Sequence, residues 1–307
     1  MGCFKKQSSK GKRLKEDNID TTVQEKAVQY PTEAALHYKA IEKLGQAARD
    51  NGIELRQSYI RVGKTALIKV QCYRHAKQMK RAKKSMNKLK TYLGRLIRDV
   101  ERKTNQMEGG LKEAWLKANQ IRNQQPKDKE KLLSWHAPEV ECISKGKSHK
   151  PYEFGCKVSV ITTAHRSKGG QFALAATALH GNPYDGHTLK SAIDEYEQTT
   201  GVKTQRIYVD KGYRGHDPSL KLNVYKSGQK RLTPTIKKEM KRRTAIEPVI
   251  GHMKNDGHLG RNYLKGKIGD MTNARLSAVG YNFRLLLKWF RFLYAYFYLN
   301  IFCSNLA

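Results

Sequence analysis

Acidic residues are scarce in this sequence of 307 residues, which contains 27 Asp and Glu against 60 Lys and Arg and has a formal net charge of +33. A surface this basic repels itself unless a polyanion neutralises it. Nucleic acid is the commonest such partner, because phosphate contacts release condensed counterions. Ribosomal proteins and basic membrane-surface proteins share this balance, so charge favours a nucleic-acid partner without indicating any chemistry.

Cysteines are few and widely spaced. The five are Cys3, Cys72, Cys142, Cys156 and Cys303, and no two of them form a CxxC pair. This spacing argues against a zinc site and against a disulfide framework.

The sequence has no long uninterrupted apolar run. Residues 283–303 are rich in aromatic and aliphatic side chains, but Arg284, Lys288 and Arg291 interrupt them. A membrane-spanning helix needs about 20 consecutive apolar residues, and the N-terminus has no apolar core of signal-peptide length. We therefore expect a cytoplasmic protein with no membrane contact, in which residues 271–307 form a helical segment packed on the core.

The apolar periodicity that is present changes twice along the chain, which predicts a mixed α/β fold interrupted by a helical module. Short strands are expected around residues 19–23, 140–160, 171–179 and 204–210, and helices at 187–199, 235–255 and 270–298. The predicted organisation is a basic arm at residues 1–9, a core from residues 10–31 and 136–270, a helical insertion at 32–135, and the C-terminal segment.

Within the insertion, Thr32 begins a helical pattern that Asn51-Gly52 ends. A second pattern from Met79 to Val100 alternates spacings of three and four, as a coiled-coil seam does. A third stripe, from Leu111 to Ile121, follows Gly109-Gly110. These features predict an antiparallel helical hairpin after the first strand, and the alternative is that the seam pairs with a second chain.

The outer face of the seam helix is strongly basic. Lys77, Lys80, Lys83 and Lys84 lie there without an intervening acid. One interpretation is a face that follows the phosphates of DNA, and the other is an ordinary solvated surface.

Three acids stand out against this basic background. Asp20 lies inside a β-prone run, where Asp is normally depleted, and Asp210 closes the apolar strand IYVD. With Glu247 on a helix, they could hold two divalent ions about 4 Å apart, and Mg²⁺ prefers such oxygen ligands. Asp210 could instead be an ordinary turn acid, and Glu247 could form a capping box with Thr244.

At these acids the sequence resembles the IS5 group of DDE transposases, within the larger IS4-like superfamily. The segments that carry the resemblance run through nearly the whole chain, in order. They are IDTTVQEK at 19–26, HAPEVECISKGKSHKPYEFG at 136–155, GNPYDGH at 181–187, VDKGYRG at 209–215 and RRTAIEPVIGHMK at 242–254.

The resemblance implies an RNase H-like catalytic core in which Asp20, Asp210 and Glu247 are the catalytic, metal-binding acids. It also implies that Arg243 and Lys254 bind phosphate, since they match the superfamily's Tyr-x2-Arg-x3-Glu-x6-Lys signature. Met240 stands in the place of that signature's tyrosine. Lys211 and Arg214, in the segment after Asp210, are further expected DNA contacts.

The implied function is DNA transposition by an insertion sequence, with phosphodiester cleavage at the element's ends and strand transfer to target DNA. The expected cofactor is a pair of Mg²⁺ ions, with Mn²⁺ as the alternative and no small-molecule cofactor. The expected partners are double-stranded DNA, as terminal inverted repeats and target, and a second copy in an active homodimer.

Two other functions fit the same residues. Family members usually have a sizeable region before the first aspartate, and here nineteen residues precede Asp20. The chain is therefore expected to be a truncated or split copy, which could be a catalytically silent, basic DNA-binding remnant. An RNase H-like nuclease outside transposition would cut DNA without joining strands.

Overall fold

The computed structural model describes residues 16–104, 106–146, 148–165, 170–215 and 222–304, with side chains to residue 298. It divides into two compact units, one formed by Met1–Ala27 with Glu141–Ala307 and the other by Val28–Val140. These units correspond to the predicted core and insertion, with boundaries shifted by a few residues. The predicted basic arm at residues 1–9 lies outside the described residues.

The first unit is built on a mixed sheet. Its described strands are β1 (Glu16–Glu25), β2 (Glu141–Ser144), β3 (Tyr152–Thr163), β4 (Ala173–Leu179), β5 (Arg206–Val209) and β6 (Asn223–Lys226). The order across the sheet is β2-β3-β1-β5-β6, and β4 also pairs with β3. Strand β3 is long enough to pair with β2 through its first residues and with β4 through its last.

The central strand β1 has one antiparallel and one parallel neighbour. It pairs antiparallel with β3, with Asp20 opposite Val160, and parallel with β5. Strand β6 continues the parallel part. Because β1 and β5 run in the same direction and Tyr208 pairs with Asn18, the residue that follows β5, Asp210, lies next to the middle of β1, where Asp20 is found.

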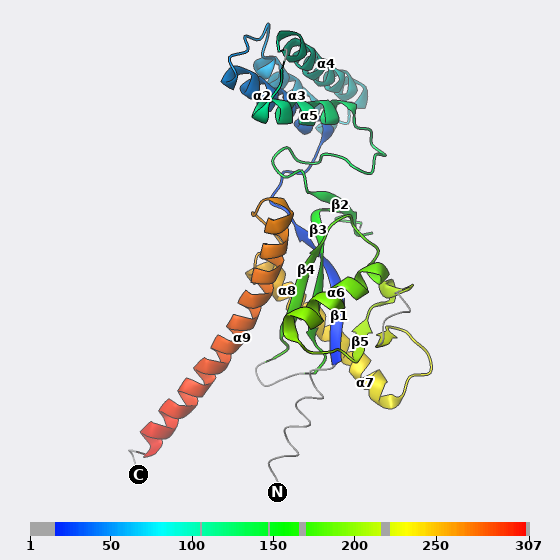
Figure 1. Cartoon of the computed structure of the whole chain (residues 1–307), viewed down its shortest axis with the longest axis vertical. Coiled ribbons are helices and arrows are strands. Elements are labelled where there is room, and N and C mark those ends of the chain that lie inside the picture. The colour runs from blue at the N-terminus through cyan, green and yellow to red at the C-terminus, as the bar shows by residue number, and fades with distance from the viewer. Residues whose placement is uncertain (1–15, 105, 147, 166–169, 216–221, 305–307) are drawn as a thin grey trace. The chain divides into compact units, whose positions relative to one another are not determined.

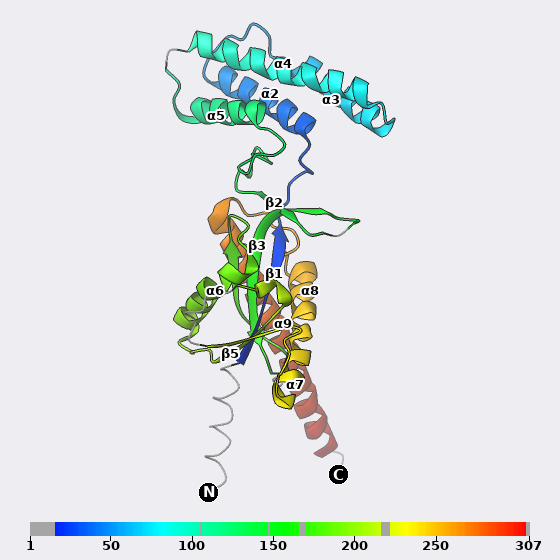
Figure 2. The same ribbon diagram turned by 90° about the vertical axis from the view of Figure 1, so that its right-hand side faces the viewer.

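Helices cover both faces of this sheet (Figure 2). Helix α6 (Asp185–Thr200) packs on one face, where Ile19, Ile161 and Ile207 share a core with Leu189 and Ile193. On the other face, α8 (Ile246–Asp256) and α9 (Gly266–Ser304) share a second apolar core with β3 and β4. Helix α7 (Pro234–Arg242) and the short helices η1 (Lys211–Tyr213) and η2 (Arg243–Ala245) complete the described elements of this unit. The predicted α/β class is confirmed.

Helix α9 corrects the prediction that the C-terminal segment packs on the core. Ala274, Ala278 and Tyr281 are buried against the sheet, but most large apolar side chains from Phe283 to Tyr298 are exposed. The physical reason is length: 39 residues at 1.5 Å each span about 58 Å, far more than the strands beneath them. Figure 1 shows the second half of α9 extending beyond the sheet. None of the described helices is long and apolar enough to cross a membrane.

The described residues of the second unit form four helices rather than the predicted hairpin. They are α2 (Glu33–Asp50), α3 (Ile60–His75), α4 (Met79–Lys103) and α5 (Gly109–Asn123). The Thr32 side chain caps α2 by accepting a hydrogen bond from the Ala35 N–H at 3.3 Å, as the sequence predicts. After α2, Gly52 adopts a left-handed φ of +70°, which ends the helix at the predicted place.

The apolar seam of α4 is buried within its own unit. Leu89, Leu93 and Leu96 are fully buried and share one core with residues of α2, α3 and α5. The intramolecular interpretation of the seam is therefore confirmed. The prediction that only the next helix, α5, covers the seam was wrong, because α2 and α3 also cover it. The seam begins at Ala82, since Met79 is exposed.

Candidate active site

Asp20 and Asp210 lie on neighbouring parallel strands of the first unit. Asp20 is in the middle of β1, and Asp210 lies between the last residue of β5 and the first residue of η1. The Asp20 Oδ1 atom accepts a hydrogen bond of 2.8 Å from the Thr21 N–H. The two side chains differ in environment, because Asp20 is 22% exposed and Asp210 is 53% exposed.

A buried arginine lies between the two aspartates. The guanidinium of Arg243, in η2, approaches Asp20 Oδ2 through Nη1 at 3.6 Å and Asp210 Oδ1 through Nη2 at 3.6 Å. Its side chain is 8% exposed, and the buried Nη1 makes no hydrogen bond. A buried charge of this kind is costly unless it is paired and hydrogen-bonded. Arg243 therefore retains donor capacity toward an anion at this site.

Glu247 lies on α8, which packs against β1, and its side chain is exposed in the first turn. The capping-box alternative does not occur in the structure. The helix begins without a side-chain cap, and Thr244 Oγ1 instead donates to the Lys241 carbonyl. Among the described residues, the carboxylate oxygens of Asp20, Asp210 and Glu247 do not all lie within 4.8 Å of one another.

Asp185 is a further acid beside Asp20 that the sequence analysis did not single out. It is the first residue of α6, and its Oδ1 accepts hydrogen bonds from Thr21 Oγ1 at 2.9 Å and from Lys157 Nζ at 3.0 Å. An acid in the first turn of a helix is common, so position alone gave no signal. Its occurrence inside the matched segment at 181–187 is the only feature that could have indicated it.

Burial dominates the electrostatics of Asp20. The pKa of Asp20 is raised to about 6, with desolvation as the largest cause. The Arg243 charge and the Thr21 hydrogen bond lower this pKa, and the charges of Asp210 and Asp185 raise it. Burial likewise raises the pKa of the Tyr213 phenol, with Asp20 and Asp185 adding to the effect. A cation bound to the Asp20 carboxylate would stabilise its charged form and so lower its pKa.

The carboxylate oxygens of Asp20, Asp210 and Glu247 are suitable ligands for a divalent cation, since Mg²⁺ prefers carboxylate oxygens. Arg243 already contacts one oxygen of each aspartate, and Thr21 binds the second oxygen of Asp20. A cation would therefore compete with Arg243 for these carboxylates, and the guanidinium would be released toward another anion.

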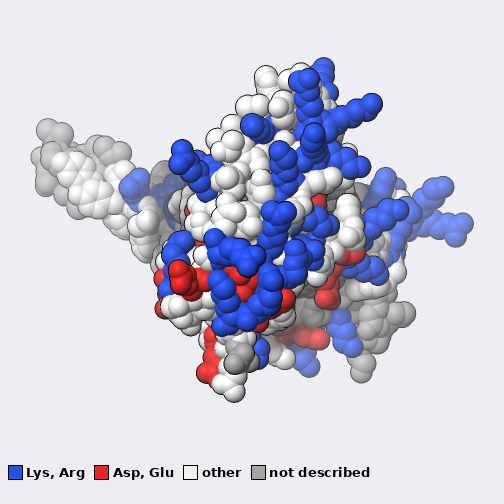
Figure 3. Space-filling view, turned by 90° about the horizontal axis from the view of Figure 1, so that it is seen from above, with Lys and Arg blue, Asp and Glu red and all other residues white. Residues whose placement is uncertain are grey.

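The remaining predicted residues are spread over the chain. Lys211 and Arg214, in and just after η1, are exposed next to Asp210 in sequence. Lys254 is partly buried at the other end of α8, where burial lowers its pKa and its charged neighbours are Glu153, Lys145, Glu25 and Lys150. In the second unit, Lys80, Lys83 and Lys84 are exposed on α4. Lys77 is also exposed, but it lies in the turn before α4 and not, as the sequence had predicted, on the helix itself. Lys and Arg predominate over Asp and Glu on the face shown in Figure 3.

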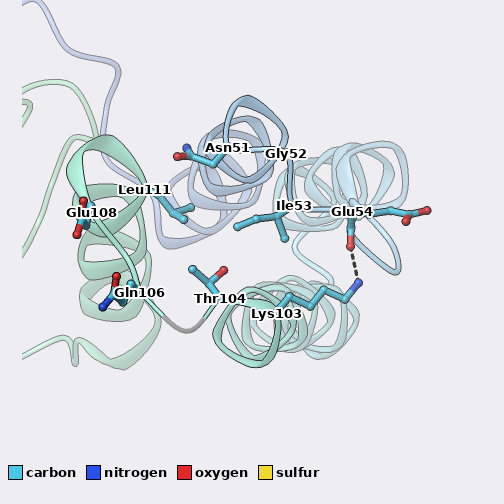
Figure 4. Close-up of a pocket in the computed structure, with 9 residues that line it drawn as sticks. All are labelled: Asn51, Gly52, Ile53, Glu54, Lys103, Thr104, Gln106, Glu108 and Leu111. Atoms are coloured by element: carbon cyan, nitrogen blue, oxygen red, sulfur yellow. Dashed lines mark hydrogen bonds between the residues drawn. The ribbon is translucent and has the colours of Figure 1, made fainter.

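The second unit contains a separate pocket, with a volume of about 740 Å³. It is formed by the turn after α2, the end of α4 and the start of α5 (Figure 4). Lys103 Nζ donates a hydrogen bond to the Glu54 carbonyl at its wall. None of the predicted site residues lines it.

Comparison with known proteins gives one partial match. The chain is 48% identical over 65 residues to "Uncharacterized protein ORF8 in nfe locus" of Rhizobium meliloti. The aligned segment covers 21% of this chain and 31% of that protein, so the chain matches about a third of its relative's length. No family model matches the chain, and no solved structure matches it significantly.

Proposed function

We propose that this chain is a DDE transposase of an insertion sequence, which cleaves phosphodiester bonds at transposon ends and transfers the strand to target DNA. The observation that carries the proposal is the position of Arg243. It is buried between Asp20 and Asp210, which lie on neighbouring parallel strands although 189 residues separate them along the chain. The resemblance of the flanking segments to the IS5 group supports it independently.

The sheet is compatible with an RNase H-like core, which is the finer fold that we propose. Strand β1 carries the first acid at the centre of the sheet, between antiparallel β3 and parallel β5. The second acid follows β5 directly. Polar groups beyond the carboxyl ends of central strands are where α/β folds usually place their sites. The third acid, Glu247, comes from a helix that packs against β1.

Asp20, Asp210 and Glu247 would hold the Mg²⁺ ions, with Mn²⁺ as an alternative. Bound there, the ions would supply Lewis-acid activation of a water or 3′-hydroxyl and would stabilise the leaving oxygen. Arg243 would donate from Nη1, which makes no hydrogen bond in the structure, to a phosphate oxygen, since guanidinium–phosphate hydrogen bonds are charge-assisted. Lys211 and Arg214, which are exposed just after Asp210, would contact the DNA backbone. An active homodimer would hold the two ends of the element.

Two other functions remain in competition. A basic DNA-binding remnant would bind DNA without using the three carboxylates. An RNase H-like nuclease would use them to cut, but would not join strands. The discriminating experiment is therefore one that reports cutting and joining separately.

The purified chain is incubated with supercoiled plasmid and Mg²⁺ or Mn²⁺, and nicked products and joined products are measured on denaturing gels. Asp20→Asn, Asp210→Asn and Glu247→Gln should each reduce nicking at least about a hundredfold, the scale on which loss of one stabilising group lowers kcat. Asp17→Asn is the matched control, since Asp17 is a buried acid on the same strand β1. It should nick at the rate of the unaltered chain.

Each outcome decides between the functions. Nicking that depends on the three acids and yields joined strands supports a transposase, and nicking without joining supports the nuclease. DNA binding without any nicking, in either metal ion, contradicts the catalytic proposal and leaves the remnant. Nicking that survives Asp20→Asn removes Asp20 from the site.

A further inference from the structure

A second cluster of possible metal ligands lies in the first unit, apart from Asp20 and Asp210. It combines Cys156 of β3, His180 directly after β4, and Asp270 near the start of α9. One ligand atom from each of the three lies within 4.8 Å of the other two. The scattered cysteines predicted no zinc site, because residues so far apart in sequence give no recognisable spacing. The fold brings them together.

His180 has no hydrogen-bond partner for either ring nitrogen, although both atoms are buried. The nearest groups are Glu141 Oε1, 3.7 Å from Nδ1, and Asp270 Oδ2, 3.8 Å from Nε2. Both separations are too long for hydrogen bonds. A buried polar atom without a hydrogen-bond partner destabilises the fold. The arrangement is therefore incomplete without a further group that the imidazole can bind.

The neighbouring residues hold the carboxylates around His180 in fixed positions. Asp270 Oδ1 accepts hydrogen bonds from Lys26 Nζ at 2.6 Å and from Asn262 Nδ2 at 2.7 Å, and Asp270 Oδ2 is the oxygen near His180. Glu141 accepts the N–H groups of Gly181 and Asn182, at 2.6 and 2.8 Å. These contacts hold the Asp270 carboxylate near Nε2 of His180, where it can act as a ligand, and the Glu141 carboxylate near Nδ1, on the opposite side of the ring. Proteins use such outer contacts to fix the ligands of a metal.

We propose that Cys156 Sγ, His180 Nε2 and Asp270 Oδ2 bind one Zn²⁺ ion, with His180 Nδ1–H directed at Glu141. Sulfur, imidazole nitrogen and carboxylate oxygen together are typical zinc ligands, and Mg²⁺ disfavours such a set. Cys156 binds as the thiolate, and its proton passes to solvent. Together with the Glu141 carboxylate beside His180, the thiolate and the Asp270 carboxylate balance the two charges of the ion and the charge of Lys26, which is ion-paired with Asp270. Three protein ligands leave a fourth position of the tetrahedron for water.

In the other His-containing cluster of the described residues, the histidine has no ring nitrogen without a partner. Glu16, His165 and Glu239 also lie close together, but both ring nitrogens of His165 are bonded. His165 Nε2 is 2.6 Å from Glu16 Oε2 and Nδ1 is 3.1 Å from Arg242 Nη1. A metal there would have to displace both contacts.

The zinc ion would tie three separate segments together. Cys156 lies on β3, His180 directly follows β4, and Asp270 belongs to the part of α9 that packs on the sheet. An ion that binds the folded chain better than the unfolded one stabilises the fold by mass action. We therefore expect the site to fix the start of α9 on the sheet, independently of the proposed chemistry at Asp20.

The test is a titration of the purified, metal-stripped full chain with Co²⁺, followed by absorption. A thiolate ligand gives a sulfur-to-cobalt charge-transfer band, and tetrahedral Co²⁺ gives intense visible bands. Cys156→Ser should abolish the charge-transfer band, and His180→Asn should weaken binding at least tenfold. Cys142→Ser and His165→Asn are the matched controls, since Cys142 is an exposed cysteine on the adjacent strand. Both should bind as the unaltered chain does.

Zn²⁺ should displace the bound Co²⁺, excess Mg²⁺ should not, and Asp20→Asn should retain the band, which separates this site from the proposed catalytic one. Zn²⁺ should also raise the Tm of the unaltered chain and of Cys142→Ser, but not that of His180→Asn. The proposal is overturned if the unaltered chain gives no charge-transfer band, or if Cys156→Ser keeps it. It is equally overturned if circular dichroism shows His180→Asn folded and binding is unchanged.

Discussion

At the scale of single residues, Asp20 shows that burial outweighs the repulsion between neighbouring acids. Several acids close together would be expected to raise a carboxylate pKa through like-charge repulsion. The pKa of Asp20 is indeed raised, but desolvation is the first cause and Asp210 and Asp185 contribute less. Arg243 offsets part of the effect. The acid is therefore tuned by its position inside the strand more than by its neighbours.

This shift predicts a stability difference that depends on pH. The folded pKa of Asp20, about 6, exceeds its ordinary value of 3.8, so between these values the folded chain holds a proton that the unfolded chain releases. Stability due to this group is therefore present at low pH and is lost as pH rises through 6. Relative to Asp20→Asn, the unaltered chain should lose about 2–3 kcal/mol of unfolding free energy between pH 4 and pH 7.

Denaturant unfolding of both proteins at the two pH values measures this difference. Asp194→Asn is the control, because Asp194 is exposed on α6, and its difference from the unaltered chain should be the same at both pH values. A difference for Asp20→Asn that does not change with pH, or that grows in the opposite direction, contradicts the burial argument.

Part of the candidate site was predictable from the sequence because its residues carry local signals. An Asp inside a β-prone run and an Asp that ends an apolar strand point to Asp20 and Asp210 without any knowledge of the fold. Asp185 carries no such signal, and its role depends on contacts with Thr21 and Lys157 that only folding creates. The same is true of Cys156, His180 and Asp270, which come from three separate elements.

At the scale of elements, helices with a strong apolar periodicity could be predicted from the sequence, and a helix with a weak periodicity could not. The start of α2 after Thr32 and the seam of α4 follow directly from cap chemistry and apolar spacing. Helix α3 was missed because it buries few and small residues, Gly63, Ala66 and Val70, and exposes Val62 and Ile68. A helix with so mixed a surface has no clear apolar stripe, and its buried side is defined by its packing against α2 and α4.

The burial of the α4 seam makes a second prediction. Leu93 is fully buried among residues of several helices, so Leu93→Ala should lower the unfolding free energy of the helical unit by about 2–5 kcal/mol. Loss of helical signal in thermal unfolding measures it. The oligomeric state, followed by analytical ultracentrifugation, should not change, because the seam is covered within its own unit.

Met79→Ala provides the comparison on the same helix. Met79 is 63% exposed, so its loss should change the unfolding free energy by no more than about 0.5 kcal/mol. If Leu93→Ala instead leaves stability intact and turns a dimer into a monomer, the seam acts between chains and the buried arrangement is not the one in solution.

At the scale of the whole molecule, the charge of +33 has to be neutralised by a polyanion, and the polyanion that we propose is DNA. Each phosphate contact contributes about −0.9 to the slope of log affinity against log salt concentration. Lys77, Lys80, Lys83 and Lys84 are exposed and follow one another closely along the chain. If α4 follows the DNA backbone, replacing all four with Gln should make the slope shallower by up to about 3.6.

A charge-matched variant separates this local effect from the loss of net charge. Lys43, Lys112, Lys127 and Lys129 are exposed elsewhere in the same unit, and replacing these four with Gln removes the same formal charge. Fluorescence anisotropy with duplex DNA at several salt concentrations gives the slope for each protein. A shallower slope for the first variant alone assigns phosphate contacts to the basic face of α4. Equal slopes for the two variants mean that this face is only solvated, and that the DNA contacts lie on the unit that holds Arg243. That unit has its own exposed cations, Lys211 and Arg214, so Gln at both positions should then reduce the slope by about 1.8.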